Sequence, residues 1–161
     1  MECDSVRTLT PCSIRTRNRV SEARDRRGLL DTSVVIAIAG VPASQLPAES
    51  AVSAITLAEL AAGPHATNDL DERARRQERL QRAEALFDPV PFDAAAARAY
   101  GRVYAAAASM GRIARGRRAV DLLIAATAVA SGLPLYTANP AEFEGLGHLV
   151  EVVPVGLAQP E

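Results

Sequence analysis

Short apolar runs that suit buried β-strands alternate with helical patterns from residue 28 to residue 153. Because strands that alternate with helices pair in parallel and place helices on both sides of the sheet, this pattern predicts an α/β fold of three layers, α/β/α, with a central parallel sheet of about five strands. The predicted strands are 28–31, 51–55, 90–92, 133–137 and 150–153, and the predicted helices are 33–39, 56–62, 69–86, 93–110 and 119–131.

Three carboxylates lie where such a fold concentrates its function. Asp31 ends the first apolar run, Glu59 lies in the helix after the second, and Asp121 opens a helix that is apolar almost all round. In open parallel sheets, ligands bind beyond the carboxyl ends of the strands. Carboxylates that meet there repel one another until a cation neutralises them. Since the candidate ligands are all oxygen atoms, we expect Mg²⁺ or Mn²⁺.

Each of these carboxylates also has a purely structural interpretation. Asp31 would suit the N-cap of the following helix, and Thr56-x-x-Glu59 fits the capping box, in which the glutamate reaches back to the N-cap amide. Asp121 would interact favourably with the dipole of its helix. For each residue alone these alternatives stay open. The occurrence of all three carboxylates at the same edge of the predicted sheet favours a metal site.

Composition and charge narrow the class of protein. The 161 residues include 18 basic residues, all of them arginine, and 19 acidic ones, so the net charge of −1 argues against nucleic-acid binding through a bulk positive field. The two cysteines, Cys3 and Cys12, lie outside the predicted domain, which suits a reducing cytoplasm. No run approaches the roughly 20 apolar residues of a membrane span. We expect a soluble, cytoplasmic protein.

The chain divides into three segments of unequal character. Residues 1–27 are rich in arginine and lack apolar periodicity, which predicts a flexible extension; residues 28–156 form one domain and residues 157–161 a tail. The extension could be an arm that contacts RNA. The favoured alternative is a segment without a dedicated role, from a gene model that begins too early.

Four segments in series resemble the motifs of the PIN domain family, and within it the VapC-type toxins of bacterial toxin–antitoxin modules. They are residues 29–34 (LLDTSV), 55–60 (ITLAEL), 121–128 (DLLIAATA) and 132–139 (GLPLYTAN). Each motif is weak alone, but the four occur in the family's order and at roughly its spacing over residues 28–153. The resemblance implies a PIN-like fold and a metal-dependent endoribonuclease.

The resemblance also implies roles for single residues. Asp31, Glu59 and Asp121 match the acidic positions that bind the divalent metal, and Thr137 matches the hydroxyl residue of the last motif, which we expect to contact substrate. In the expected mechanism, Asp31 and Asp121 hold the cation, and Glu59 orients the attacking water or completes the metal shell. The cation polarises the scissile phosphate and lowers the pKa of that water. No histidine is required as a general base.

The fourth acidic position of the family is altered in this chain. Many relatives have an aspartate at the position of Asn139 or just after it, and Glu142 precedes Phe143 where the pair Asp-Phe is common in the family. We therefore predict a catalytic role for Asn139 but leave open whether it or Glu142 is the fourth ligand, and whether one or two metals bind. The departure also keeps an alternative open: a catalytically inactive PIN-like module that binds RNA or a protein.

Two groups of arginines are candidates for RNA binding. Arg112, Arg115, Arg117 and Arg118 crowd the loop before the third motif, where they form either a solvated turn or a rim that binds phosphate. Arg117 and Arg118 are the predicted substrate contacts. The arginines of the helix 69–86 are expected on a solvated face; they are residues 73, 75, 76, 79 and 82. The expected partners are RNA, a cognate VapB-type antitoxin that blocks the acidic pocket, and a second copy in a homodimer.

Overall fold

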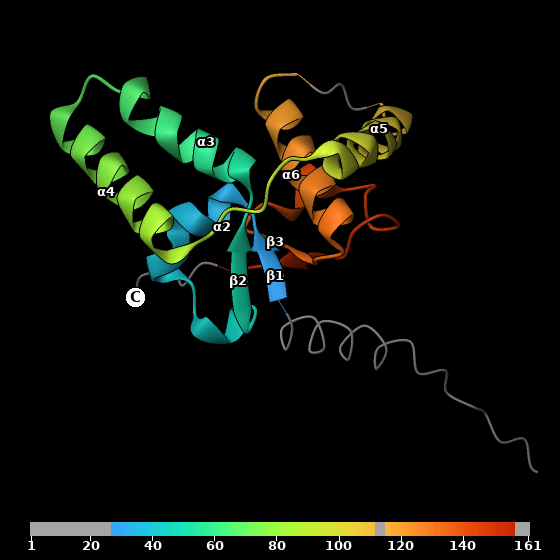
Figure 1. Cartoon of the computed structure of the whole chain (residues 1–161), viewed down its shortest axis with the longest axis horizontal. Helices are drawn as coiled ribbons and strands as arrows, with labels where there is room; N and C mark the ends of the chain where they lie inside the picture. The colour runs from blue at the N-terminus through green and yellow to red at the C-terminus, as the bar shows by residue number, and fades with distance from the viewer. Residues whose placement is uncertain (1–26, 112–114, 157–161) are drawn as a thin grey trace, which may run out of the picture.

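The computed structural model describes residues 27–111 and 115–156, and its centre is a four-stranded parallel sheet in the order β2-β1-β3-β4 (Figure 1). The strands are β1 (Arg27–Leu30), β2 (Glu49–Val52), β3 (Leu135–Thr137) and β4 (Val152–Pro154). The helices are α2 (Thr32–Ala37), α3 (Ala54–Ala62), α4 (Leu70–Leu86), α5 (Ala94–Ser109) and α6 (Arg117–Ser131). Short 3₁₀ helices η1 (Ile38–Gly40), η2 (Ala43–Gln45), η3 (Gly63–Ala66) and η4 (Pro140–Phe143) complete the elements. The predicted fold class is confirmed.

Alternate residues of the strands face two separate hydrophobic clusters. Leu29 of β1 packs in the cluster that contains α5 and α6, whereas Leu30 packs in the cluster that contains α2, α3 and α4. Both leucines are fully buried. This period of two is the normal consequence of the β pleat, and it explains why β1 reads as a continuous apolar run. Figure 1 shows the two sets of helices on opposite sides of the sheet.

The segment 90–92, predicted as a fifth strand, forms only a single bridge between Val90 and Ser53. Val90 donates its amide hydrogen to Val52 and accepts one from Ala54, at 2.9 and 2.8 Å. Prolines on both sides of Val90 have no amide hydrogen to continue the ladder. The pairing therefore ends after one residue, and the sheet has four strands rather than five.

The helix after β2 begins earlier than predicted. Ser53 is the N-cap of α3, and its hydroxyl accepts the amide hydrogen of Thr56 at 2.9 Å. Helices α4 and α5 begin behind Asp69 and Asp93, whose carboxylates accept amide hydrogens of the first turn. Helix α6 ends at Gly132, which has the left-handed conformation (φ 64°) that a C-terminal glycine supplies.

Several predictions concern residues that the structure does not describe. The extension up to residue 26, Arg112 and the tail 157–161 lie outside the described residues, whereas Arg27 is the first residue of β1. Among the residues that are described, no helix is both long and apolar enough to cross a membrane.

Candidate active site

The order of the strands places a switch point between β1 and β3. From β1 the chain crosses to β2 on one side of the sheet and later returns to β3 on the other. Connections that leave neighbouring strands in opposite directions open a crevice at their carboxyl ends. Asp31 follows the last residue of β1, and Thr137 is the last residue of β3, so the two lie on either side of this crevice.

Asp31 is held by hydroxyl groups from both sides of the switch point. The hydroxyls of Ser33 and Thr137 both donate to its Oδ2, at 2.6 and 3.0 Å. Ser33 also accepts the amide hydrogen of Ala138 at 3.2 Å, which ties the loop after β3 to the start of α2. Among the described residues no group donates to Oδ1 of Asp31. Although Asp31 occupies the N-cap position of α2, its side chain makes no capping hydrogen bond, so the capping interpretation is wrong.

Glu59 is fixed in a similar way. The Thr32 hydroxyl donates to its Oε2 at 2.5 Å and thereby links α2 to α3. The capping-box interpretation of Glu59 is wrong, because α3 begins at Ala54 behind the Ser53 cap and Glu59 lies in the second turn. Its second oxygen, Oε1, receives no hydrogen bond from the described part of the chain.

Asp121 is the carboxylate that most needs a positive partner. It is the fifth residue of α6, past the first turn, where the helix dipole has little effect. The residue is only 6% exposed, yet none of the described residues donates a hydrogen bond to it. Burial raises the pKa of this carboxyl from its ordinary 3.8 to about 6, with the charge of Asp31 as the next cause. Arg117 opposes this rise in the pKa, while Glu59 and Glu142 add to it.

The donor set fits a hard divalent cation. Asp31 and Glu59 each have one carboxylate oxygen held by hydroxyls and one without a donor, and Asp121 is buried among negative charges. Oxygen ligands of this kind suit Mg²⁺ or Mn²⁺. Across residues 27–111 and 115–156, however, no three acidic, histidine or cysteine side chains form a preformed metal cluster. Asp31 and Asp121 are the residues that could hold such an ion, since Asp31 is the charge with the largest effect on Asp121, and Glu59 has a smaller effect.

The last motif contributes support rather than a ligand. Thr137 is completely buried, and its hydroxyl donates to Asp31 and accepts the amide hydrogen of Asn139 at 3.0 Å. Its position favours orientation of Asp31 over the predicted contact with substrate. Asn139 is exposed, whereas Glu142 lies close enough for its charge to raise the pKa of Asp121. Of these two candidates for the fourth acidic position, Glu142 is electrostatically coupled to the site.

The two predicted phosphate contacts differ in their surroundings. Arg118 is largely buried and donates to a carboxylate oxygen of Glu142 at 3.3 Å and to its backbone carbonyl at 3.2 Å, so it anchors η4 to α6. Arg117 is exposed and lines a cavity that also contains Thr32 and Glu59. The guanidinium of Arg117 can therefore contact a ligand at the acidic site, whereas that of Arg118 is already bonded to Glu142.

Sequence reasoning missed part of the site. It did not assign Thr32 and Ser33 to the site, although their hydroxyls donate to the carboxylates of Glu59 and Asp31. Their position directly after Asp31 was the available signal. The predicted solvated face of α4 is only partly correct, because Arg76 and Arg79 are half-buried and line the same cavity as Glu59. The spacing of arginines along one helix does not reveal that a second helix, α2, lies over them.

Comparisons with known proteins agree with the fold. Residues 28–148 match the PIN domain family. The chain is 37% identical to ribonuclease VapC5 of Mycobacterium tuberculosis over 113 residues, which are 68% of this chain and 81% of that protein. Its fold is similar to a member of the VapBC family of toxin–antitoxin systems, VapBC-5 of the same organism, with a TM-score of 0.69 and 35% identity over 80% of this chain and 98% of that one. It is also similar to FitAcB of Neisseria gonorrhoeae, with a TM-score of 0.58 and 26% identity over 77% of this chain and 94% of that one.

Proposed function

Because the chain belongs to the PIN domain family, we propose that it is a VapC-type ribonuclease that hydrolyses RNA phosphodiester bonds with the help of Mg²⁺ or Mn²⁺. The identity to ribonuclease VapC5 supports the activity. The chemistry is supported by the electrostatic coupling of Asp121, on α6, to Asp31, which follows β1, and to Glu59, on α3.

One observation carries this proposal: the buried, unpartnered carboxylate of Asp121 interacts with the charges of Asp31 and Glu59. A fold gains nothing from this arrangement by itself, since burial and like charges both destabilise the ionised form. A divalent cation between Asp31 and Asp121 would remove the penalty. When bound, such an ion supplies positive charge that stabilises the charge developing on the phosphate in the transition state.

The chain's own residues would supply orientation and polarity. Ser33 and Thr137 fix one oxygen of Asp31, and the other oxygen, which has no donor among the described residues, would bind the cation. Thr32 fixes one oxygen of Glu59, whose free oxygen would accept a proton or a hydrogen bond from the attacking water. Arg117, on the rim, would bind a phosphate oxygen.

The proposal is tested by removing single charges at constant shape. Asp31→Asn and Asp121→Asn should each lower the rate of cleavage of a fluorophore-labelled RNA pool at least about 100-fold in Mg²⁺ or Mn²⁺, a typical cost for the loss of one charge-stabilising group. Asp88→Asn is the matched control, because Asp88 is exposed and lies outside the site. A chelator should abolish wild-type cleavage.

The same assay distinguishes the enzyme from an inactive binding module. If wild type and both Asn variants fail to cleave RNA but bind it equally well, the chain is a binding module. Equal cleavage by wild type, Asp31→Asn and Asp121→Asn would show that a different site carries the activity.

The proposal extends to the partners and the segments of the chain. Solved relatives are toxin–antitoxin assemblies, which supports a VapB-type antitoxin as the partner of this chain in the cytoplasm. The nuclease domain would comprise residues 28–156, with 1–27 and 157–161 as additional segments, and would form a homodimer. Co-expression of a small antitoxin encoded beside the gene should suppress toxicity, and light scattering of the purified chain should give twice the mass of the monomer.

A further inference from the structure

The acidic site extends into a second, basic compartment that its catalytic groups do not use. A cavity of about 510 Å³ begins at Thr32 and Glu59 and continues between α2, α3 and α4. Its volume lies within the range of sites that hold a ligand the size of a nucleotide. Its walls contain Arg76 and Arg79 of α4 and Arg117 of α6.

The three arginines of this cavity differ in whether their charge is already neutralised. Arg76 donates to Glu72 at 2.7 Å and to the carbonyl of Gly63 at 3.1 Å. Arg79 and Arg117 have no ion pair or hydrogen bond among the residues that the structure describes. Glu72 does not compensate them, because it is shared between Arg75 and Arg76, which lower the pKa of its carboxyl. The guanidinium groups of Arg79 and Arg117 therefore have no hydrogen-bonded partner among the described residues, although the charge of Arg117 also acts on Asp121.

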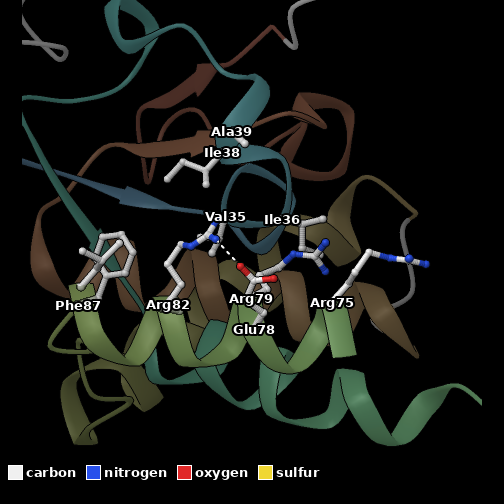
Figure 2. Close-up of a pocket in the computed structure, with 11 residues that line it drawn as sticks. Val35, Ile36, Ile38, Ala39, Arg75, Glu78, Arg79, Arg82 and Phe87 are labelled. Atoms are coloured by element: carbon white, nitrogen blue, oxygen red, sulfur yellow. Dashed lines mark hydrogen bonds and ion pairs between the residues drawn. The ribbon is translucent and has the colours of Figure 1, made fainter. Parts of the chain in front are cut away.

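Arg79 is the more constrained of the two. Figure 2 shows it on α4 between Arg75 and Arg82, reaching towards Ile36 of α2. Ile36 and Arg79 also line a smaller hollow of about 240 Å³ on the other side, so they form the partition between the two spaces. Arg82, one turn further along, is bonded to Glu78 at 2.8 Å. A half-buried guanidinium without a partner loses part of its hydration and gains no hydrogen bond in return. An anion in the cavity would supply the missing hydrogen bonds.

We propose, on the basis of the ribonuclease function above, that Arg79 binds an RNA phosphate away from the cleavage point, so that the strand passes from Arg117 across Glu59 into this cavity. A guanidinium forms two parallel hydrogen bonds with a phosphate, which suits a fixed arginine in a wall. The residues that line the cavity include no aromatic side chain, so bases are not stacked there and the contact is to the backbone. Arg79 thereby acts as a positioning contact that is independent of the bases it passes.

The test compares two arginines of the same helix. Arg79→Gln and Arg82→Gln remove the same charge from α4, but only Arg79 lines the large cavity. Both are made in full-length Asp31→Asn protein, so that RNA is bound without being cut. Binding of a fluorescein-labelled, random-sequence single-stranded RNA of about 12 nucleotides, a length within the range of single-strand binding sites, is followed by anisotropy at several salt concentrations.

Arg79→Gln should weaken binding roughly tenfold and reduce the slope of log K against log salt by about 0.7, the value for one phosphate contact on a single strand. Arg82→Gln should stay within about twofold of the parent in affinity, the scale of an exposed charge. Arg79→Lys should keep most of the slope and lose part of the affinity, because it retains charge without the fork of two donors. In otherwise wild-type protein, Arg79→Gln should raise KM for this RNA and leave kcat unchanged. Melting curves confirm that each variant is folded.

Equal effects of Arg79→Gln and Arg82→Gln would overturn the proposal. So would unchanged RNA binding by Arg79→Gln combined with weaker binding of the antitoxin encoded beside the gene, since Arg79 would then serve a protein partner. If wild type fails to cleave RNA while binding still depends on Arg79, the ribonuclease function fails and the phosphate site stands. If wild type cleaves RNA and Arg79→Gln behaves like Arg82→Gln, the phosphate site fails and the ribonuclease function stands.

Discussion

Replacing Asp121 by asparagine should stabilise the metal-free protein while it abolishes cleavage. Burial and the charge of Asp31 raise the pKa of this carboxyl from 3.8 to about 6. Since each pKa unit corresponds to about 1.4 kcal/mol, the fold loses about 3 kcal/mol when it holds the ionised form at neutral pH. Asparagine has the same shape and no charge, so it resembles the protonated aspartate at every pH.

The sign of the pH dependence follows from the direction of the shift in the pKa of Asp121. Well below pH 3.8 the carboxyl is protonated in both the folded and the unfolded chain, and the full stability is present. As the pH rises towards 6, the unfolded chain releases this proton more readily, so the free energy of unfolding falls. Above about pH 7 the loss is complete. The advantage of Asp121→Asn should therefore be small at pH 3.5, below about 0.5 kcal/mol, and reach about 3 kcal/mol at pH 7.5.

Urea unfolding in the presence of a chelator, at pH 3.5, 5.5 and 7.5, measures this difference between wild type and Asp121→Asn. Asp88→Asn is the control and should match wild type at pH 7.5, since Asp88 is exposed. Added Mg²⁺ should stabilise wild type and not Asp121→Asn, because only wild type retains both ligands. If Asp121→Asn is no more stable than wild type at pH 7.5, or if its full advantage persists at pH 3.5, the electrostatic argument is refuted.

Three further predictions concern residues around the site. Thr32→Val removes the hydroxyl that holds Glu59, so kcat should fall roughly tenfold, while the free energy of unfolding should stay within about 1 kcal/mol of wild type. A normal kcat would show that this hydrogen bond is dispensable. Ser53→Ala removes the cap of α3 and should lower the free energy of unfolding by about 1 kcal/mol in urea titrations, with Ser44→Ala, an exposed site, as the control. Gly28→Ala places a Cβ in steric clash with the Cε2 and Cδ2 carbons of Tyr136 and should cost about 1–3 kcal/mol. A melting temperature equal to that of wild type would contradict this contact.

The sequence predicted the fold class because its signals are local. The apolar run around Leu29 and Leu30 has the composition of a strand buried on both faces, and Asp93 and Gly132 mark helix ends through backbone chemistry that needs no tertiary context. The prediction of a fifth strand at 90–92 was wrong because the prolines on both sides of Val90 prevent further strand pairing. These prolines are visible in the sequence, and their effect outweighs the apolar composition that suggested a strand.

The sequence predicted which residues belong to the site, but it did not predict which of them contact one another. Asp31, Glu59 and Asp121 were identified from their positions at the ends of strands and on helices, together with the family motifs. The order of the strands decided that the hydroxyl of Thr137, 106 residues from Asp31 in sequence, donates to it.

By itself, the sequence determined the alternation of strands and helices, the three acidic positions and the likeness to the PIN domain. Only the tertiary structure shows that neighbouring arginines have different surroundings. Arg118 is bonded to Glu142, whereas Arg117 lines the cavity. Arg82 is paired with Glu78, whereas Arg79 is not. The physical reason is that the free energy of a charged side chain depends on its burial and on its partners. Both are set by elements that meet only when the whole chain is folded.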